Sequence, residues 1–237
     1  MALPKLNNSP SYEMIIPSSG KRVRYRPFLV KEQKSLMLAA ESNDNKVMFR
    51  SVLDILTECI EDKIYERQLA SFDVEYMFLQ LRAKSVGESS DISIKCDKCN
   101  HANDVKVQLD TIEVEINNNI EKKIELTDDI KVQLKYPSYI DMINSGIGDG
   151  ELNSNQMFNI MHSCIEYVET PDERIDMREV DQKEVTEFIE SMNTEQFKNL
   201  QDFLTTMPRL NHTVEFKCTE CGHDNEILVE GISNFLW

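Results

Sequence analysis

The sequence lacks long apolar runs. Its 237 residues are 41% hydrophobic and 29% charged, an ordinary balance for one or two globular domains. The longest apolar stretches, "VLDILTECI" and "VEYMFLQL", are interrupted by charges and are far shorter than the roughly 20 residues of a membrane span. The start, "MALPKLNNSPSYE", has no charged segment followed by an apolar one, so no secretory signal is predicted. We expect a protein without a membrane span that stays in the cytoplasm where it is made.

Histidine is scarce, and the usual catalytic signatures are missing. The four histidines belong to no His-Glu-x-x-His pattern, and no Gly-x-Ser-x-Gly elbow occurs. The stretch "SGIGDGE" at 145–151 resembles a phosphate-binding loop, but it follows a helix-like segment and lacks a following Gly-Lys-Ser/Thr, so we interpret it as a plain loop. His162, in "IMHSCI", is expected to be a core or boundary residue. The sequence predicts a protein that is not an enzyme.

Positive charge is also in short supply, except at the start of the chain. The net charge is −16, yet residues 1–34 hold seven Lys or Arg against two Glu, a net of +5, which leaves −21 on the rest. An acidic body repels phosphate backbones and argues against a nucleic-acid partner. The basic start, with Arg22, Arg24 and Arg26 on one face of a predicted strand, suits an acidic partner or the protein's own acidic body.

Periodicity and capping residues predict an α+β fold. Alternation at 12–16 and 21–26, around a Pro-Ser-Ser-Gly turn, indicates a hairpin. Three helices are predicted next, over 29–42, from residue 44 or 45 to about 60, and from Ser71 to Gly87. Short antiparallel strands follow up to residue 136. Helices are then predicted at 138–144, 154–168, 181–192 and 194–206, and two last strands at 212–218 and 225–230.

This pattern predicts three parts. Residues 1–88 form a hairpin and helical region, residues 89–136 and 209–237 form an antiparallel strand region, and residues 137–208 form a helical insertion between the two halves of that strand region.

One short pattern occurs twice. "IKCDKCNHANDV" begins at residue 94 and "FKCTECGHDNEI" at residue 216, and each lies at a bend between two strand-like segments. A Cys-x-x-Cys turn presents two sulfurs to one centre, so two copies complete a tetrahedral site. In the reducing cytoplasm, paired cysteines favour metal over disulfides. We therefore predict a split zinc-ribbon-like site whose ligands are Cys96, Cys99, Cys218 and Cys221, with zinc favoured over iron.

Four thiolates leave no open coordination position, so the predicted zinc is structural rather than catalytic. Several alternatives stay open. His101 or His223 could replace a thiolate, or the thiols could be reduced and without metal. A redox role is disfavoured because such motifs usually open a helix. Cys59 and Cys164 lie on apolar helix faces and are expected to be core residues.

Several segments carry a resemblance to a known family. The start "ALPKLNNSPSYEMIIPSSGKRVRYRPFLVKEQKSLMLAAES", with "FDVEYMFLQLRAKSVGE" and "VQLKYPSY", resembles the baseplate hub assembly family of T-even-type contractile-tailed phages. The resemblance is strongest over residues 1–90 and vague across the helical insertion. It implies a non-enzymatic hub component or assembly catalyst with other hub proteins as partners. The expected location is the host cytoplasm during assembly or the virion tail baseplate; the oligomeric state stays open.

The main rival is a zinc-ribbon protein that binds nucleic acid or takes part in transcription. The two Cys-x-x-Cys turns, which we call the knuckles, would suit such a protein, but the residues that flank them are acidic.

The last residues, "ISNFLW", place Ile232, Phe235, Leu236 and Trp237 close together. They are predicted either to dock on the protein's own core or to anchor a partner.

Overall fold

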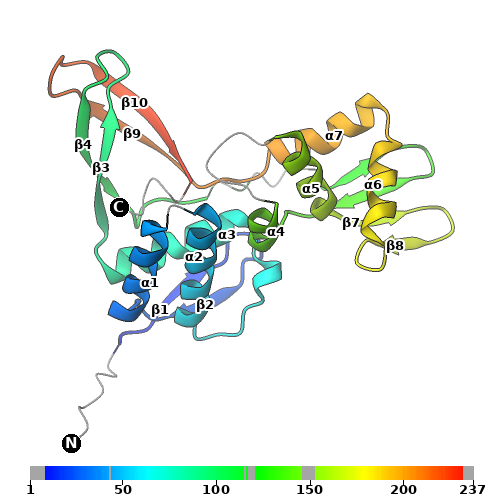
Figure 1. The fold of residues 1–237 in the computed structure, drawn as a ribbon, viewed down its shortest axis with the longest axis horizontal. Helices are drawn as coiled ribbons and strands as arrows, with labels where there is room; N and C mark the ends of the chain where they lie inside the picture. The colour runs from blue at the N-terminus through cyan, green and yellow to red at the C-terminus, as the bar shows by residue number, and fades with distance from the viewer. Residues whose placement is uncertain (1–8, 43, 115, 117–120, 146–152, 232–237) are drawn as a thin grey trace, which may run out of the picture. The chain divides into compact units, whose positions relative to one another are not determined.

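The computed structural model describes residues 9–42, 44–114, 116, 121–145 and 153–231, and it shows an α+β protein (Figure 1). The chain divides into two compact units. The first combines residues 1–66, 72–115 and 209–237, and the second combines residues 67–71 and 116–208. Among the described helices, none combines the length and apolar character of a bilayer span.

The first unit begins with the predicted hairpin. Strand β1 (Tyr12–Ile15) pairs antiparallel with β2 (Arg22–Tyr25), and the buried Val23 lies opposite Met14. A turn closed by the Gly20 N–H and the Ile16 carbonyl, 2.8 Å apart, joins the strands.

Three helices follow where the sequence predicts them: α1 (Val30–Glu41), α2 (Asn45–Cys59) and α3 (Ser71–Ser85). Asp44 caps α2 by accepting from the Lys46 N–H at 2.8 Å, which satisfies a helix-terminal donor. From residue 51 onward α2 has one buried face, whereas Val47 near its start is exposed. Helix α3 is buried on nearly all sides, which explains why its apolar residues show no single stripe.

Two further hairpins complete the first unit. Strand β3 (Ser89–Lys95) pairs with β4 (Ala102–Gln108), and β9 (Asn211–Lys217) pairs with β10 (Asp224–Glu230), both antiparallel. An isolated bridge between Val114 and Leu210 joins the points where the chain leaves and re-enters this unit. Both hairpins and α3 share one core, with these buried members: Leu79, Ala83, Ile92, Val107, Leu109, Ile112, Leu210, Val214 and Val229.

The second unit is a four-stranded antiparallel sheet with helices. The sheet order is β5 (Lys123–Glu125), β6 (Lys131–Leu134), β7 (Ile165–Glu169) and β8 (Arg174–Asp176). The helices are α4 (Tyr139–Asn144), α5 (Ser154–Cys164), α6 (Gln182–Glu190) and α7 (Thr194–Thr205). Buried residues of the sheet and of α5, α6 and α7 form a separate core.

The structure corrects the expected organisation in three places. Residues 165–168, predicted to continue a helix, form β7, because Val168 pairs with Val132 of β6. Strands β5 and β6, expected beside the knuckles, pair instead within the sheet of the second unit. Of residues 111–116, which lie in the predicted run of strands, the described ones form no strand and contribute the isolated bridge at Val114. The segment 137–208 is therefore mixed rather than purely helical. The glycine-rich loop at 146–150 and the apolar residues 232–237 lie outside the described residues.

Candidate metal centre

Four cysteine sulfurs from two distant parts of the chain lie together at the turns of two hairpins. The Sγ atoms of Cys96 and Cys221 are 3.7 Å apart, and those of Cys99 and Cys218 are 3.6 Å apart. All four lie within 4.8 Å of one another. Thiolates bound to zinc at about 2.3 Å place tetrahedral sulfurs about 3.8 Å apart, whereas a disulfide would bring two sulfurs to about 2.05 Å. The arrangement fits a tetrahedral metal site.

Each Cys-x-x-Cys turn is shaped by its own backbone. In the first, the Cys96 N–H donates to the His101 carbonyl and the Asn100 N–H donates to the Cys96 carbonyl, both at 2.9 Å. The second turn repeats these bonds at matching positions, at 2.8 and 3.0 Å. The corresponding residues Asn100 and Gly222 have φ angles of 59° and 67°. Glycine and asparagine are the residues that best tolerate this left-handed conformation, so both sequences suit the same turn.

Two buried asparagines tie one turn to the other. The side-chain carbonyl of Asn225 accepts from the Asp97 N–H at 3.0 Å, and that of Asn103 accepts from the Thr219 N–H at 2.9 Å. Each side-chain amide also donates to the carbonyl of the histidine in its own turn. Asn103 and Asn225 are both 4% exposed. We call these reciprocal bonds the asparagine brace.

Sequence reasoning gave these asparagines no role, although both stand in the repeated pattern. Asn103 follows Cys96 by the same interval as Asn225 follows Cys218. The sequence therefore did mark these two asparagines, because both copies of the pattern have Asn at this position. What the pattern could not reveal is that each asparagine reaches across to the opposite turn.

Backbone N–H groups polarise the thiols. Hydrogen bonds from the Cys221 N–H and then the Glu220 N–H outweigh burial and lower the pKa of Cys218 to about 6. At Cys99 the His101 N–H acts in the lowering direction, but burial and the three neighbouring thiols raise the pKa to about 12. Adjacent thiolates repel one another, so full ionisation of the four calls for a cation between them.

The histidines of the repeated pattern stay outside this cluster. Within the described part of the chain, the close group of ligand atoms consists of the four cysteine sulfurs and includes no imidazole. His101 and His223 are exposed and contribute their backbone carbonyls to the turns. The structure thus brings together the four predicted cysteines and favours them over a set in which histidine replaces a thiolate.

The surface around the turns is acidic. Seven carboxylates and four lysines are exposed on and beside the two turns: Asp91, Asp97, Asp104, Glu215, Glu220, Asp224 and Glu226 against Lys95, Lys98, Lys106 and Lys217. Zinc bound by four thiolates would add a further net charge of about −2. This surface is unsuited to a phosphate backbone.

The other two cysteines are core residues, as predicted. Cys59 and Cys164 are buried at the ends of α2 and α5. Burial raises the pKa of Cys59 to about 11 and raises the pKa of Cys164 as well, so both stay protonated thiols at neutral pH.

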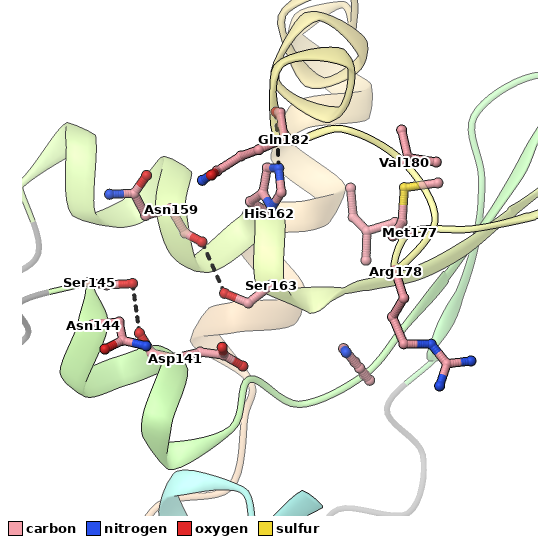
Figure 2. Close-up of a pocket in the computed structure, with 12 residues that line it drawn as sticks. Asp141, Asn144, Ser145, Asn159, His162, Ser163, Met177, Arg178, Val180 and Gln182 are labelled. Atoms are coloured by element: carbon pink, nitrogen blue, oxygen red, sulfur yellow. Dashed lines mark hydrogen bonds between the residues drawn. The ribbon is translucent and has the colours of Figure 1, made fainter. Parts of the chain in front are cut away.

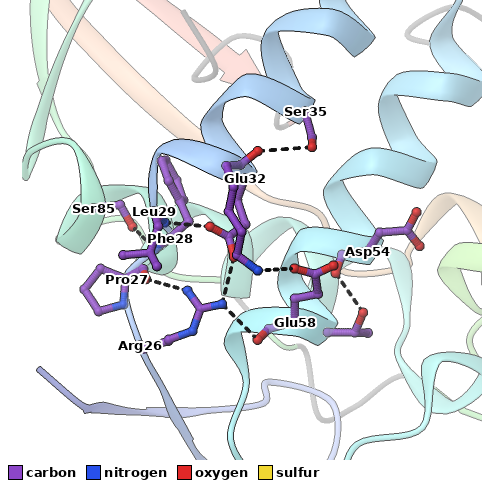
Figure 3. A network of polar contacts seen from close by, with 11 residues as sticks. Arg26, Pro27, Phe28, Leu29, Glu32, Ser35, Asp54, Glu58 and Ser85 are labelled. Carbon is purple, nitrogen blue, oxygen red and sulfur yellow. Dashed lines mark hydrogen bonds and ion pairs between the residues drawn. The ribbon is translucent and has the colours of Figure 1, made fainter. Parts of the chain in front are cut away.

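A buried ion-pair network lies in the first unit, where the hairpin meets α1 and α2 (Figure 3). Glu32, 2% exposed, accepts from Arg26 at 2.7 Å and from the Leu29 N–H at 2.8 Å, and its carboxylate is 3.1 Å from Lys31. Burial would raise the pKa of Glu32, but these partners, Arg26 foremost, lower it to about 2. The Arg26 guanidinium also donates to the Glu58 carbonyl at 3.3 Å.

The structure pairs the basic face of the hairpin with acids of the same chain. Arg22 contacts Glu13 at 2.9 Å, and Arg24 contacts Asp62 at 3.1 Å. Arg22 and Arg24 remain largely exposed, but the Arg26 side chain is mostly buried, so it does not share their outer face as we had expected. Of the two alternatives for the basic start, the structure shows the contact with the protein's own acidic groups.

A polar cleft of about 460 Å³ lies in the second unit (Figure 2). Its hydrogen bonds serve the local backbone: the Ser163 hydroxyl donates to the Asn159 carbonyl at 3.0 Å, and His162 Nε2 lies 3.2 Å from the Gln182 carbonyl. Ser163 and His162 are therefore not arranged as nucleophile and base. His162 is a half-buried boundary residue, as predicted.

Comparison with models of protein families matches residues 9–237 to the family described as T4 bacteriophage base plate protein. The chain belongs to this family. The match confirms the resemblance seen in the sequence and extends it across the segment 137–208, where the resemblance had been vague.

A relative within the base plate proteins covers nearly the same length. "Baseplate hub assembly protein gp26" of Enterobacteria phage T4 is 22% identical over 224 residues, which make up 94% of this chain and 97% of the relative. No solved structure matches the chain.

Proposed function

We propose that this base plate protein is a non-enzymatic structural or assembly protein of a phage tail baseplate hub, folded around one structural zinc ion. The observation that carries the hub role is the family match over residues 9–237, together with a relative of similar length whose name states hub assembly. The partners in this proposal are other hub proteins. The place of action is the host cytoplasm during assembly, with the virion tail baseplate as the location if the protein remains in the particle.

The zinc part of the proposal rests on the four sulfurs. Their separations of 3.6 and 3.7 Å in two of the pairs are close to the tetrahedral value of about 3.8 Å. The asparagine brace holds the two turns in register at the same place. When bound, zinc would neutralise the thiolates and would cross-link the hairpins that precede and follow the segment 116–208.

A structural role for this site follows from its ligand set. With four thiolates bound, zinc has no open position for a water or a substrate, so it would fix shape without performing chemistry. The rigid hairpin pair would then present a constant acidic surface to partners. That acidic surface also weighs against the zinc-ribbon alternative, a nucleic-acid-binding protein, because counterion release favours lysine and arginine at such an interface.

Affinity purification from infected cells tests the hub role. We expect the tagged chain to recover other baseplate hub proteins, and a search for the same chain in mature particles separates a hub component from an assembly factor. Recovery of DNA or of transcription proteins, with no hub protein, would overturn the proposal.

A further inference from the structure

An apolar groove runs between α1 and α3 in the first unit, away from the knuckles. It has a volume of about 320 Å³, and its lining residues are Phe28, Gln33, Leu36, Met37, Phe78, Arg82 and Val86. Phe28, Leu36 and Phe78 are buried, whereas Met37 is 51% exposed and Val86 59% exposed. Large exposed apolar side chains at the rim of an apolar groove are typical of an interaction surface.

The groove contains one charged side chain, that of Arg82. Its Nη2 donates to the Ser90 hydroxyl at 3.1 Å, while its Nη1 is buried and has no hydrogen-bond partner among the described residues. No carboxylate in the described part of the chain forms an ion pair with it. Burial lowers the pKa of Arg82, but a guanidinium stays charged at neutral pH. Arg82 as a whole is half-buried, but its Nη1 is enclosed without a counter-ion among the described residues, and such a charge is costly unless an anion pairs with it.

The lining contrasts with the rest of the protein. The chain carries a net charge of −16, yet no aspartate or glutamate lines the groove. A carboxylate entering the groove would therefore meet a guanidinium without facing an acidic side chain in the lining, and it would form a charge-assisted hydrogen bond in a desolvated place. The apolar walls select for an apolar neighbour next to that carboxylate.

We propose that this groove binds a partner segment that presents an apolar side chain next to a carboxylate, with Arg82 as the carboxylate receptor. That the segment comes from another hub protein rests on the proposed function. The binding chemistry does not, and it can be measured with a small probe on the isolated full-length chain.

The probe is 3-phenylpropionate, compared with 3-phenylpropanamide, which has the same shape without the charge. The readout is the NMR shift of the Met37 and Val86 methyl groups, with the buried Met161 of the second unit as an internal reference. We expect saturable shifts at Met37 and Val86 with the carboxylate and about tenfold weaker binding of the amide. In Arg82→Gln the two compounds should bind equally weakly.

A second variant keeps the proposal testable if Arg82→Gln fails to fold. Met37→Glu changes an exposed residue, so the fold should be retained, and its carboxylate should compete with the probe and abolish the Val86 shift. Equal binding of acid and amide to the unmodified chain, or no shift with either, would overturn the proposal. Binding that appears only after deletion of residues 232–237 would overturn it in favour of the chain's own segment, and a Val86 shift that depends on protein concentration alone would point to a second copy.

Discussion

The four-cysteine cluster and the Glu32 network both gather ionisable side chains at one place, but they differ in where the opposite charge comes from. Glu32 is neutralised by Arg26 and Lys31 of the same chain. At the knuckles, the close group of possible metal-ligand atoms among the described residues consists of the four cysteine sulfurs. The Glu32 site is complete in its own side chains, whereas in our proposal the cysteine cluster is completed by a zinc ion.

This difference predicts how the two sites respond to treatment. A chelator should affect the knuckles and spare the Glu32 network. Mild acid alone cannot separate them, because protonation releases zinc from thiolates and also titrates carboxylates. Variants that change one site at a time are needed.

Zinc removal should have the largest effect. We expect a strong chelator to loosen β3, β4, β9 and β10, because zinc binding supplies roughly 10 to 16 kcal/mol in small zinc-finger peptides. The sheet of the second unit has its own core and should stay protected. Hydrogen exchange by mass spectrometry measures both. If the four strands keep their protection without metal, the hairpins are held by apolar packing and the asparagine brace instead.

Glu32→Gln should come next, with a loss of about 3 kcal/mol in the free energy of unfolding, because it leaves Arg26 without its buried partner. Since the pKa of Glu32 is lowered to about 2 in the folded state, its contribution is complete above the unfolded value near 4.5 and is lost as pH falls toward 2. Urea unfolding between pH 7 and pH 3 should show this loss in the unmodified chain and not in Glu32→Gln. The exposed pair offers a control: Glu13→Gln should cost less than about 1 kcal/mol.

The asparagine brace should have an intermediate effect on the metal. Asn103→Ala and Asn225→Ala should each weaken zinc affinity by roughly 10- to 100-fold, since groups that support metal ligands typically contribute that much. Asn103→Ala should cost more, because its side chain also accepts from the Thr219 hydroxyl at 2.9 Å. Competition with a chromophoric chelator measures the affinities, and Asp104→Ala is the exposed neighbour control. Affinities equal to that of the control would reduce the brace to a local turn contact.

The smallest expected effect distinguishes the two turns. Gly222→Asn copies the first turn into the second and should cost only a few tenths of a kcal/mol, whereas Gly222→Ala should cost about 1 kcal/mol. The cost of alanine does not come from a lack of space, because a Cβ at Gly222 would meet nothing closer than Lys217 Cε at 4.0 Å. It comes from the φ angle of 67°, which alanine tolerates poorly. Thermal melting resolves the difference. Equal losses for both variants would remove the backbone explanation for asparagine at position 100.

Local signals predicted most helices, the three hairpins and the four cysteines. Asp44 and Asp181 cap α2 and α6 at the residues where the sequence predicts these helices to begin, and the repeated pattern identifies the sulfurs without any structure. These signals act over a few residues. The repeat is readable because the same local turn occurs twice.

Long-range pairing was not predictable in the same way. Ile165 and Val168 are buried apolar residues that fit a helix or a strand, and only the pairing of Val168 with Val132 decides for β7. The contacts of Asn103 and Asn225 likewise depend on which turn lies opposite. No periodicity within one segment contains that information.

The most direct test of a structural zinc is the metal content of the chain purified without chelator, measured by elemental analysis and native mass spectrometry. We predict one zinc per chain in the unmodified protein and in a variant with both His101→Ala and His223→Ala, and loss of zinc in Cys96→Ser and Cys218→Ser. A folded, unmodified chain with a metal content near zero would contradict the account.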